Sequence, residues 1–353
     1  MTQPGFFDLA RRYESLDQKK DPLAALERLV PWSRFRPSLL AAFELAGVRA
    51  SAVARKSAAG RKPWDEVIIF KVLVLQALYN LGDDNLEFLL RDRLSFMRFL
   101  GLGLSDRVPD AKTVWLYREA LAKVGAIETL FAEFDAYLRQ SGYLAMGGQI
   151  VDATIVPVPK NRNSRAENAT IKAGETPAGW DDAPAMQRQK DIDARWTMKN
   201  GQSYYGYKNH ISVDRKHKLV RCYTVTSAAR HDSQELAAVL DATNTASDVW
   251  ADSAYRSAET EALLAERGFK SRIHRKGNRK RTLSAREEQG NKTRSRVRAR
   301  VEHVFATFVT VMGGKVVRTI GIARARAKIG MTNLAYNMKR YVWLKQATTD
   351  AIA

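Results

Sequence analysis

The stretch GGQIVDATIVPVPKNRN, residues 147–163, decides the fold, because a carboxylate stands inside its β-branched centre. Residues 150–156, IVDATIV, have the composition of a buried strand. An unpaired charge on Asp152 in such a strand would cost several kcal/mol or take up a proton. We therefore expect Asp152 to serve a chemical purpose.

The chain downstream of residue 146 changes to a period of two and then mixes strands with helices. YYGYKNHISVDRKHKLVRCYTVTSA, residues 204–228, predicts two strands in a hairpin that turns at 214–217. Shorter strands are expected at 247–251 and 269–275, and helices at 232–244, 257–268, 291–312 and 333–344. Three antiparallel strands followed by βαβ units predict a mixed five-stranded sheet with helices on its faces. This order matches the ribonuclease-H-like fold.

Two domains are predicted from the change of pattern. Residues 1–145 form an all-helical N-terminal domain, and residues 146–345 form the α/β domain, with an irregular polar insert at 157–203 that is expected either to be partly disordered or to become ordered on DNA. In the helical domain, PDAKTVWLYREAL with Lys112, Thr113 and Arg118 exposed is compatible with a helix-turn-helix, although such a signal is weak in a single sequence. The alternative is an all-helical oligomerisation domain.

Two further acids lie in settings that resemble that of Asp152. Asp252, in VWADSAYRSAE, follows a short apolar strand, and ligand sites form beyond the carboxyl ends of strands in open α/β sheets. Glu302, in RSRVRARVEHVFATF, lies beside the apolar stripe of a helix and shares a face with Arg294 and Arg298. In the ribonuclease-H-like order, the three elements that carry these acids meet at one edge of the sheet. The plainer alternative is that Glu302 only pairs with Arg298.

Three carboxylates in one cleft predict a bound cation, because they would otherwise repel each other. No His or Cys cluster accompanies them, and oxygen ligands alone indicate Mg²⁺ or Mn²⁺ and not zinc. Two such ions about 3.5–4 Å apart would clamp the attacking and leaving oxygens of a phosphoryl transfer.

The net charge indicates a partner rich in phosphate. The chain has 58 basic and 38 acidic side chains, a balance of +20, although a very soluble or ribosome-associated protein would also fit. Residues 272–300 hold 12 basic and two acidic side chains, a local charge of +10, which favours a phosphate track over a merely solvated face. The predicted DNA contacts are Lys112, Arg118, Lys208, His210, Arg275, Lys276, Arg279, Lys280, Arg281, Arg294 and Arg298.

Several classes of protein are excluded or disfavoured. A single cysteine, Cys222, allows no disulfide or zinc cluster within one chain. The longest apolar stretch, 67–81, contains polar residues and is too short to span a bilayer, so we expect a buried helix and no membrane association. Gly313, Gly314 and Lys315 lack the rest of a Walker loop, so ATP is not expected.

Taken together, IVDATIV, GYKNH, HDS, ADSAY and RARVEHVF, with PDAKTVWLYREAL and NLAYNMKR, resemble the DDE transposases of bacterial insertion sequences, and the insertion-sequence-five group most closely. The likeness runs from about residue 60 to 345. It implies a ribonuclease-H-like catalytic domain that uses Mg²⁺, as two ions that Mn²⁺ can replace, with Asp152, Asp252 and Glu302 as catalytic residues and metal ligands.

The resemblance also implies partners and a location. The helical N-terminal domain would bind the terminal inverted repeats of double-stranded DNA and mediate oligomerisation. A homodimer on DNA would cleave the element's ends and join them to target DNA by transesterification. Such a protein would work in the bacterial cytoplasm, associated with the nucleoid.

One departure from the family pattern leaves other functions open. Related transposases carry a Tyr, Arg, Glu, Lys signature on the glutamate helix, and here Arg298 fits the arginine, whereas Ser295 and Val309 stand at the tyrosine and lysine places. Lys315 is a candidate replacement for the lysine. The alternatives are a metal-dependent nuclease of the same fold and a catalytically inactive copy that only binds DNA. Short inverted repeats flanking the coding region would favour the transposase.

Overall fold

The computed structural model describes residues 8–49, 63–159, 161–277 and 281–350, which fall into two compact units. One unit comprises Met1–Leu130 with Met338–Ala353, and the other comprises Phe131–Asn337. The boundary predicted from the sequence lies at residue 145 instead, and that prediction does not include the return of the chain to the first unit from Met338 onward. Each unit is described by itself.

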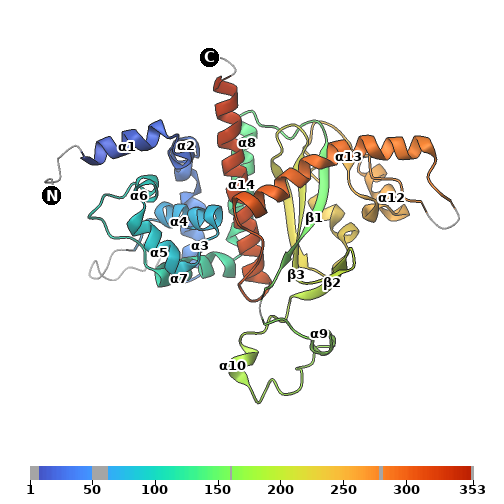
Figure 1. Cartoon of the computed structure of the whole chain (residues 1–353), viewed down its shortest axis with the longest axis horizontal. Coiled ribbons are helices and arrows are strands. Elements are labelled where there is room, and N and C mark those ends of the chain that lie inside the picture. The colour runs from blue at the N-terminus through green and yellow to red at the C-terminus, as the bar shows by residue number, and fades with distance from the viewer. Residues whose placement is uncertain (1–7, 50–62, 160, 278–280, 351–353) are drawn as a thin grey trace. The chain divides into compact units, whose positions relative to one another are not determined.

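The first unit is helical, as its amphipathic segments predict (Figure 1). Its elements are α1 (Asp8–Gln18), α2 (Pro22–Leu29), η1 (Trp32–Phe35), α3 (Arg36–Leu45), α4 (Glu66–Tyr79), α5 (Asp83–Asp92), α6 (Leu94–Leu100), α7 (Ala111–Lys123) and the start of α8 (Ala126–Gln140). Every residue of α4 from Glu66 to Leu78 except Ile68 is buried, which confirms a buried helix here. Asp65 caps this helix by accepting from the Val67 and Ile68 amides at 2.9 and 3.1 Å.

Helix α7 begins where the sequence predicts, at Asp110, whose carboxylate accepts from the Thr113 amide at 2.7 Å. Lys112 is exposed on this helix. Arg118 is not: its guanidinium forms an ion pair with Asp83, with Nη2 donating to Oδ2 at 2.9 Å, and Nη1 donates to Gln76 Oε1 at 3.1 Å. The expectation of an exposed Arg118 is therefore wrong, because its guanidinium is partly buried and balances the charge of Asp83 within the unit.

The second unit is built on a mixed sheet of six strands. The strands are β1 (Gln149–Pro157), β2 (Arg195–Lys199), β3 (Gln202–Asp214), β4 (Val220–Ser227), β5 (Asp248–Trp250) and β6 (Lys270–Ser271). Their order is β2-β3-β1-β5-β6, with β4 also paired to β3. β1 is antiparallel to β3 and parallel to β5. The predicted strands are present, and the sixth strand, β2, comes from the insert.

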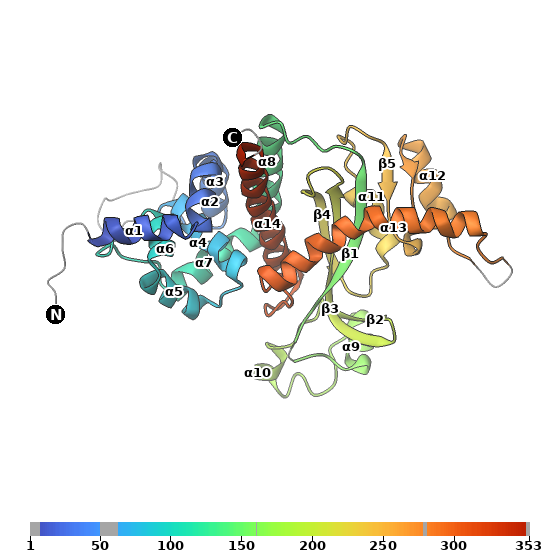
Figure 2. The same ribbon diagram turned by 45° about the horizontal axis from the view of Figure 1, so that its top comes forward.

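Helices cover both faces of this sheet. They are η3 (Asp232–Glu235), α11 (Leu236–Val239), η4 (Ser253–Tyr255), α12 (Ala258–Glu266), α13 (Ala285–Ala306), the π-helical turn η5 (Thr307–Val311) and the first part of α14 (Ile322–Asp350). Figures 1 and 2 both show α13 crossing β1. The other face is filled by a cluster that includes Val151, Val249, Leu236 and Leu264. Alternation along β1 therefore directs even-numbered residues toward α13 and α14, and odd-numbered residues toward α11 and α12.

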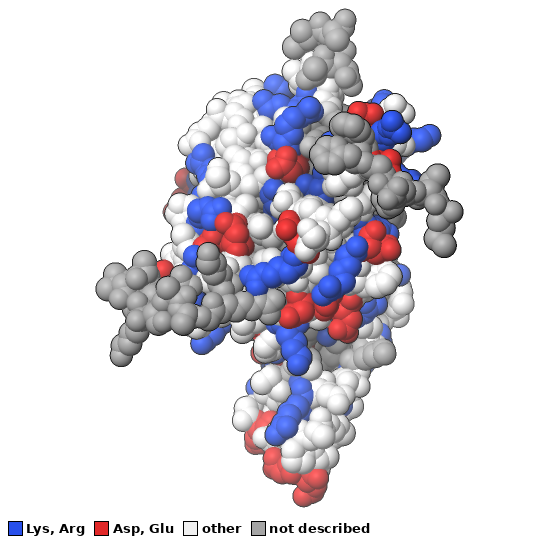
Figure 3. Space-filling view, turned by 90° about the vertical axis from the view of Figure 1, so that its left-hand side faces the viewer, with Lys and Arg blue, Asp and Glu red and all other residues white. Residues whose placement is uncertain are grey.

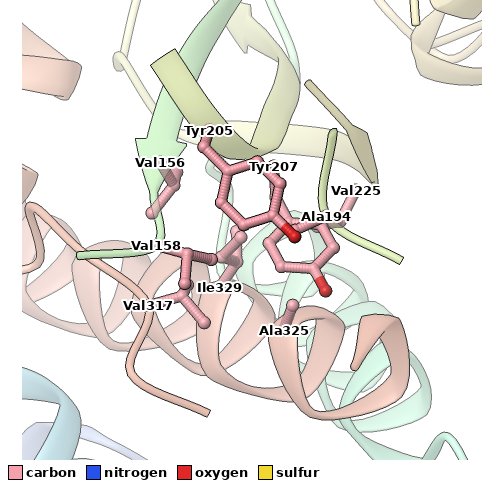
Figure 4. Close-up of a cluster of buried hydrophobic side chains, with 9 residues drawn as sticks. All are labelled: Val156, Val158, Ala194, Tyr205, Tyr207, Val225, Val317, Ala325 and Ile329. Atoms are coloured by element: carbon pink, nitrogen blue, oxygen red, sulfur yellow. The ribbon is translucent and has the colours of Figure 1, made fainter. Parts of the chain in front are cut away.

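The structure describes the insert at 157–203 except for residue 160. It contains α9 (Arg165–Lys172), α10 (Pro184–Gln187) and β2. Between these elements, the described residues of the insert have no regular secondary structure, as expected, and buried side chains hold them in place. Asp191 accepts the Tyr207 hydroxyl at 2.7–2.8 Å, and Tyr205 and Tyr207 pack with Ile329 of α14 in the core drawn in Figure 4.

The described residues contain no membrane-spanning helix, and charges of both signs are mixed on the face drawn in Figure 3. No helix in the described ranges is long and apolar enough to cross a membrane. On the face drawn in Figure 3, Lys and Arg side chains are interspersed with Asp and Glu, so the net positive charge does not gather there into one patch.

Candidate active site

The parallel pairing of β1 with β5 brings two of the three predicted acids to the same level. Gln149 is opposite Val249 and Ile150 is opposite Trp250, so the same register, continued by two residues, sets Asp252 beside Asp152. Neighbouring strands are about 4.8 Å apart, and residues at the same level share a face. The two aspartates therefore form a carboxylate pair at the end of β5, on the α13 face of the sheet.

Each carboxylate of the pair is fixed by a local backbone bond. Asp152 Oδ1 accepts from the Ala153 amide at 2.8 Å. Asp252 Oδ1 accepts from the Ala254 amide at 2.8 Å and thereby begins the short helix η4. One oxygen of each side chain is thus used for orientation, and the other is left for a different partner.

Helix α13 supplies the cation next to this pair. Arg298 Nη2 donates to Asp152 Oδ2 at 3.0 Å, and both side chains are 14% exposed. Arg298 Nε is buried without a hydrogen-bond partner within the described residues. The plainer prediction for this helix, a pair between Arg298 and Glu302, is thus replaced by a pair between Arg298 and Asp152.

The electrostatics of Asp152 answer the question that its place in the strand raises. Burial raises the pKa of Asp152, the positive charge of Arg298 lowers it, and the negative charge of Asp252 raises it again. The net direction is upward, so one arginine does not compensate fully for burying this carboxylate beside a second one. A further positive charge near Asp152 and Asp252 would stabilise their ionised forms.

Glu302 follows Arg298 by one helical turn, but its side chain is exposed. Within residues 8–49, 63–159, 161–277 and 281–350, no three His, Cys, Asp or Glu side chains gather into a group that could hold a metal ion. The structure therefore assembles Asp152 and Asp252 and leaves Glu302 outside their immediate group.

The carboxylate pair fits a hard divalent cation. Its oxygen donors match the preference of such ions, and burial raises the pKa of Asp152, with the charge of Asp252 adding to the rise, so a bound cation would favour the ionised form. Asp152 and Asp252 are the side chains that would hold the ion. Glu302 is the nearest acid on α13 in sequence to Arg298 and remains the predicted third ligand.

His274 adjoins the same site, and the sequence analysis did not identify it. Its amide donates to the Ala251 carbonyl at 3.1 Å, which places it next to Asp252. Its Nε2 lies 3.4 Å from the hydroxyl of Ser295 on α13. Burial, followed by the charges of Arg298 and Arg294, lowers the pKa of His274. No local motif marks this histidine, because only the pairing beyond β6 brings it here.

The structure corrects the expectation that His210 and Lys208 face DNA. His210 is fully buried, and its Nε2 lies 2.8 Å from the hydroxyl of Thr226. The Lys208 ammonium donates to the Arg230 carbonyl at 2.8 Å and pairs with Asp232 at 2.7 Å. Asp232 thus binds Lys208, and the ring of His231 caps the start of η3 by accepting from the Ser233 amide. Lys208 and His210 both lie on the α11 face of the sheet, and both bind partners inside the second unit.

The predicted basic track is described in part. Arg275, Lys276 and Arg281 are exposed, and two of them share Glu287, at 4.0 Å from Arg275 and 2.8 Å from Arg281. Burial and then the charges of Arg275, Arg256 and Arg272 lower the pKa of Arg294, which indicates crowded positive charge. The predicted contacts Arg279 and Lys280 lie outside the described residues.

Comparison with known proteins adds two findings. Residues 144–338 match the family model described as "Transposase DDE domain", and residues 11–120 match the one described as "Transposase domain (DUF772)". The first match alone spans more than half of the 353 residues. No solved structure matches the chain.

Proposed function

The chain belongs to the family of transposases with a DDE domain, and from this premise we propose that it acts on the ends of its own insertion sequence. It binds the terminal inverted repeats, cleaves the DNA there and joins the freed ends to target DNA. The insertion-sequence-five group is the group that the chain's motifs favour. The observation that carries this proposal is the carboxylate pair of Asp152 and Asp252 at one level of β1 and β5, with α13 laid across them.

The order of the sheet supports a ribonuclease-H-like catalytic domain. A hairpin of β3 and β4 is paired antiparallel to β1, and β5 and β6 follow in parallel on the other side of β1. This arrangement sets an acid on the central strand next to an acid at the end of its parallel neighbour. The glutamate helix then crosses the same face (Figure 2).

The family implies a divalent metal ion, and we propose Mg²⁺, with two ions and with Mn²⁺ as a substitute. Asp152, Asp252 and Glu302 would hold the ions, and bound ions would activate the attacking oxygen and stabilise the leaving 3′-oxygen of the phosphodiester. The protein's own contribution is to orient the two aspartates through the Ala153 and Ala254 amides. The reaction exchanges one phosphodiester for another and requires no ATP.

Arg298 has a second role in this proposal. Its Nη2 holds Asp152, while its buried Nε has no partner within the described residues. A phosphate oxygen cannot reach that buried atom, but the Arg298 side chain is 14% exposed and its accessible N–H groups can donate to phosphate, because hydrogen bonds from guanidinium to phosphate are strong and directional. With Arg294 one turn earlier, Arg298 would draw the DNA backbone toward the carboxylate pair.

The remaining parts of the proposal concern DNA and assembly. Exposed Arg275, Lys276 and Arg281 follow the backbone of the DNA end, and the helical first unit, which matches its own transposase family model, reads the repeat with Lys112 among its contacts. Two copies of the chain pair the two ends as a homodimer on DNA, at the bacterial nucleoid.

A catalytically inactive DNA-binding copy is the second candidate, and one observation favours it. Glu302 is exposed and outside the group formed by the two aspartates. If Glu302 does not join them on DNA, the chain would bind repeats without cutting. A nuclease of the same fold would instead cut without needing the repeat.

A cleavage assay separates these functions. The purified chain is mixed with Mg²⁺ or Mn²⁺ and a labelled duplex that carries the flanking repeat, and then with a duplex of scrambled sequence. We expect cutting at the repeat boundary only, and loss of cutting but not of binding in Asp152→Asn, Asp252→Asn and Glu302→Gln. Glu288→Gln, an exposed glutamate in the first turn of the same helix, is the matched control and should cut normally. Binding without cutting by the unaltered chain would favour the inactive copy, and equal cutting of both duplexes the nuclease.

A further inference from the structure

His274 and Ser295 form a polar pair that has no role in the proposed function described above. Ser295 belongs to α13, and His274 belongs to the chain that continues β6 beside Ala251. Their side chains come from segments 21 residues apart and meet at 3.4 Å. Asp252 is the next residue after Ala251, so the pair lies directly beside one of the two proposed metal ligands.

The pair contributes little to stability, because its bond is longer than the usual hydrogen-bond range and lies at the surface. Ser295 is exposed and His274 is half-buried. Variants that remove the pair should therefore fold normally.

The surroundings of the pair are positively charged, and they disfavour a further positive charge on the ring of His274. Arg294 and Arg298 flank Ser295 along α13, and their charges join burial in disfavouring a proton on the His274 ring. A neutral imidazole has one donor and one acceptor. In the tautomer in which the Ser295 hydroxyl donates to Nε2, Nδ1 carries the proton and has no partner within the described residues. That N–H is left to donate to a ligand.

We propose that His274 and Ser295 together form a neutral contact to the sugar–phosphate backbone of the DNA end, beside the carboxylate of Asp252. This inference rests on the proposed function, since the ligand is the DNA end that the transposase cuts. The two arginines attract phosphate from any direction, whereas a single N–H fixed by Ser295 accepts only one placement of an oxygen. His274 is thus a positioning residue that aligns the strand to be cut.

The proposal predicts a split between binding and cutting in a single-turnover assay on the labelled repeat duplex. His274→Ala and Ser295→Ala should each slow cutting by about 10- to 100-fold, because a small misplacement of reacting atoms has a large effect on rate. Binding of the uncut duplex should weaken by no more than about tenfold, the value of one neutral hydrogen bond. The double variant should be no slower than the worse single variant, because the two side chains act as one unit. His274→Gln, which keeps a neutral donor, should recover part of the rate.

A salt series distinguishes this neutral contact from a charged one. His274→Ala should leave the slope of the logarithm of the DNA-binding constant against the logarithm of salt concentration unchanged. Arg294→Gln should make that slope shallower by about one unit. Thr293→Ala is the matched control on α13, since its hydroxyl bonds only to the Gln289 carbonyl of its own helix. It should bind and cut as the unaltered chain does.

The outcomes that overturn the inference are distinct from those that overturn the proposed function. If the unaltered chain cuts the repeat and His274→Ala cuts equally fast, or if the two single effects add fully, the pair has no joint positioning role. If His274→Ala lowers the salt slope as Arg294→Gln does, the contact is charged and the inference is wrong. If the unaltered chain does not cut at all, the proposed function fails, and the role of the pair fails with it.

Discussion

Asp152 combines two features that oppose each other: a buried, β-branched strand favours an apolar side chain, whereas the proposed metal site requires a charged one. The strand around it is β-branched and buried, yet the side chain is a carboxylate with a second carboxylate beside it. Burial raises the pKa of Asp152 against the opposing charge of Arg298, and Asp252 adds to the rise. Functional sites commonly retain such unfavourable groups at the expense of stability. Asp152 should therefore weaken the fold of the metal-free chain.

This conflict predicts that Asp152→Asn stabilises the protein in the presence of EDTA. A raised pKa means that the folded state binds the proton more tightly, so the stability of the unaltered chain falls as the pH rises from about 4 through the raised pKa. At pH 7 the variant should melt higher by about 2–4 °C, the shift that roughly 1 kcal/mol gives in a domain of this size. Below about pH 4 the difference should vanish, because both side chains are then neutral.

Calorimetry between pH 3 and pH 8 measures this difference. Asp248→Asn is the matched control, because Asp248 opens β5 and pairs with Arg272 near the surface at 2.7 Å. Its effect should stay within about 0.5 kcal/mol. A variant Asp152→Asn that melts lower than the unaltered chain at pH 7 would show that Arg298 compensates fully for the buried charge.

At the scale of elements, the insert shows how a polar segment becomes ordered. Ser164 begins α9 with a capping box in which it accepts from the Glu167 amide and Glu167 accepts from the Ser164 amide. The Glu167 carboxylate also accepts from Trp180 at 2.9 Å and from Lys190 at 3.3 Å. One side chain thereby connects three parts of the insert. The capping box is visible in the sequence, but the bonds to Trp180 and Lys190 join positions that no periodic pattern connects.

The insert should therefore lose stability in acid. Burial alone would raise the pKa of Glu167, but the Ser164 amide, Trp180 and Lys190 lower it to about 2. The depressed pKa gives stability that is fully present above about pH 4.5 and is lost as the pH falls toward 2. Glu167→Gln should lower the free energy of unfolding by about 1 kcal/mol at pH 7, as loss of a helix cap does, and its effect should be largely lost at pH 2.

Chemical denaturation of the two proteins at several pH values tests this expectation. Glu175→Gln, an exposed acid of the same insert, should leave stability unchanged at every pH. An effect of Glu167→Gln that persists at pH 2 would mean that its shape and not its charge stabilises the insert.

At the scale of the whole molecule, the sequence predicts the order of strands and helices better than it predicts their long-range contacts. The strand at 150–156, the hairpin after it and the long helix with Arg298 follow from periodicity and turn residues. By contrast, Asn333 and Asn337 are buried in α14, where they bond to Asn209 and to the backbone of Val220 across more than 100 residues. Periodicity identifies apolar faces, and it carries no signal for an amide that docks a helix onto a strand.

The candidate site shows the same division. Asp152 could be selected because a carboxylate is out of place inside a β-branched strand, and Asp252 because it follows the carboxyl end of a short apolar strand. His274 and the partner of Arg298 could not, because both depend on the register between strands and on how α13 crosses them. The burial of His210 was missed for a related reason: alternation assigns a residue to one face of a strand but does not say what covers that face.

The charge of the whole chain predicts a steep dependence of DNA binding on salt, and residues 272–300 should carry much of it. Replacing Arg275, Lys276 and Arg281 together by Gln removes three charges, so the slope of log K against log salt should fall by about 2 to 3 units. The lower value is expected if Glu287, which Arg275 and Arg281 share, then repels the phosphates. Because phosphate contacts carry no sequence information, repeat and scrambled duplexes should be affected alike.

A triple variant of equal charge change tests whether position or total charge matters. Lys172, Arg188 and Lys199 are exposed on the insert, and none of them belongs to the predicted track. If the +20 balance acts only through long-range attraction, replacing these three by Gln should reduce binding as much as the track variant does. If the DNA backbone lies along the track, the insert variant should keep nearly the full salt slope, because only direct phosphate contacts release counterions. We expect the second result from titrations at 50 to 300 mM salt. Salt screens charges that lie more than about 10 Å from the DNA, whereas direct contacts with phosphates persist.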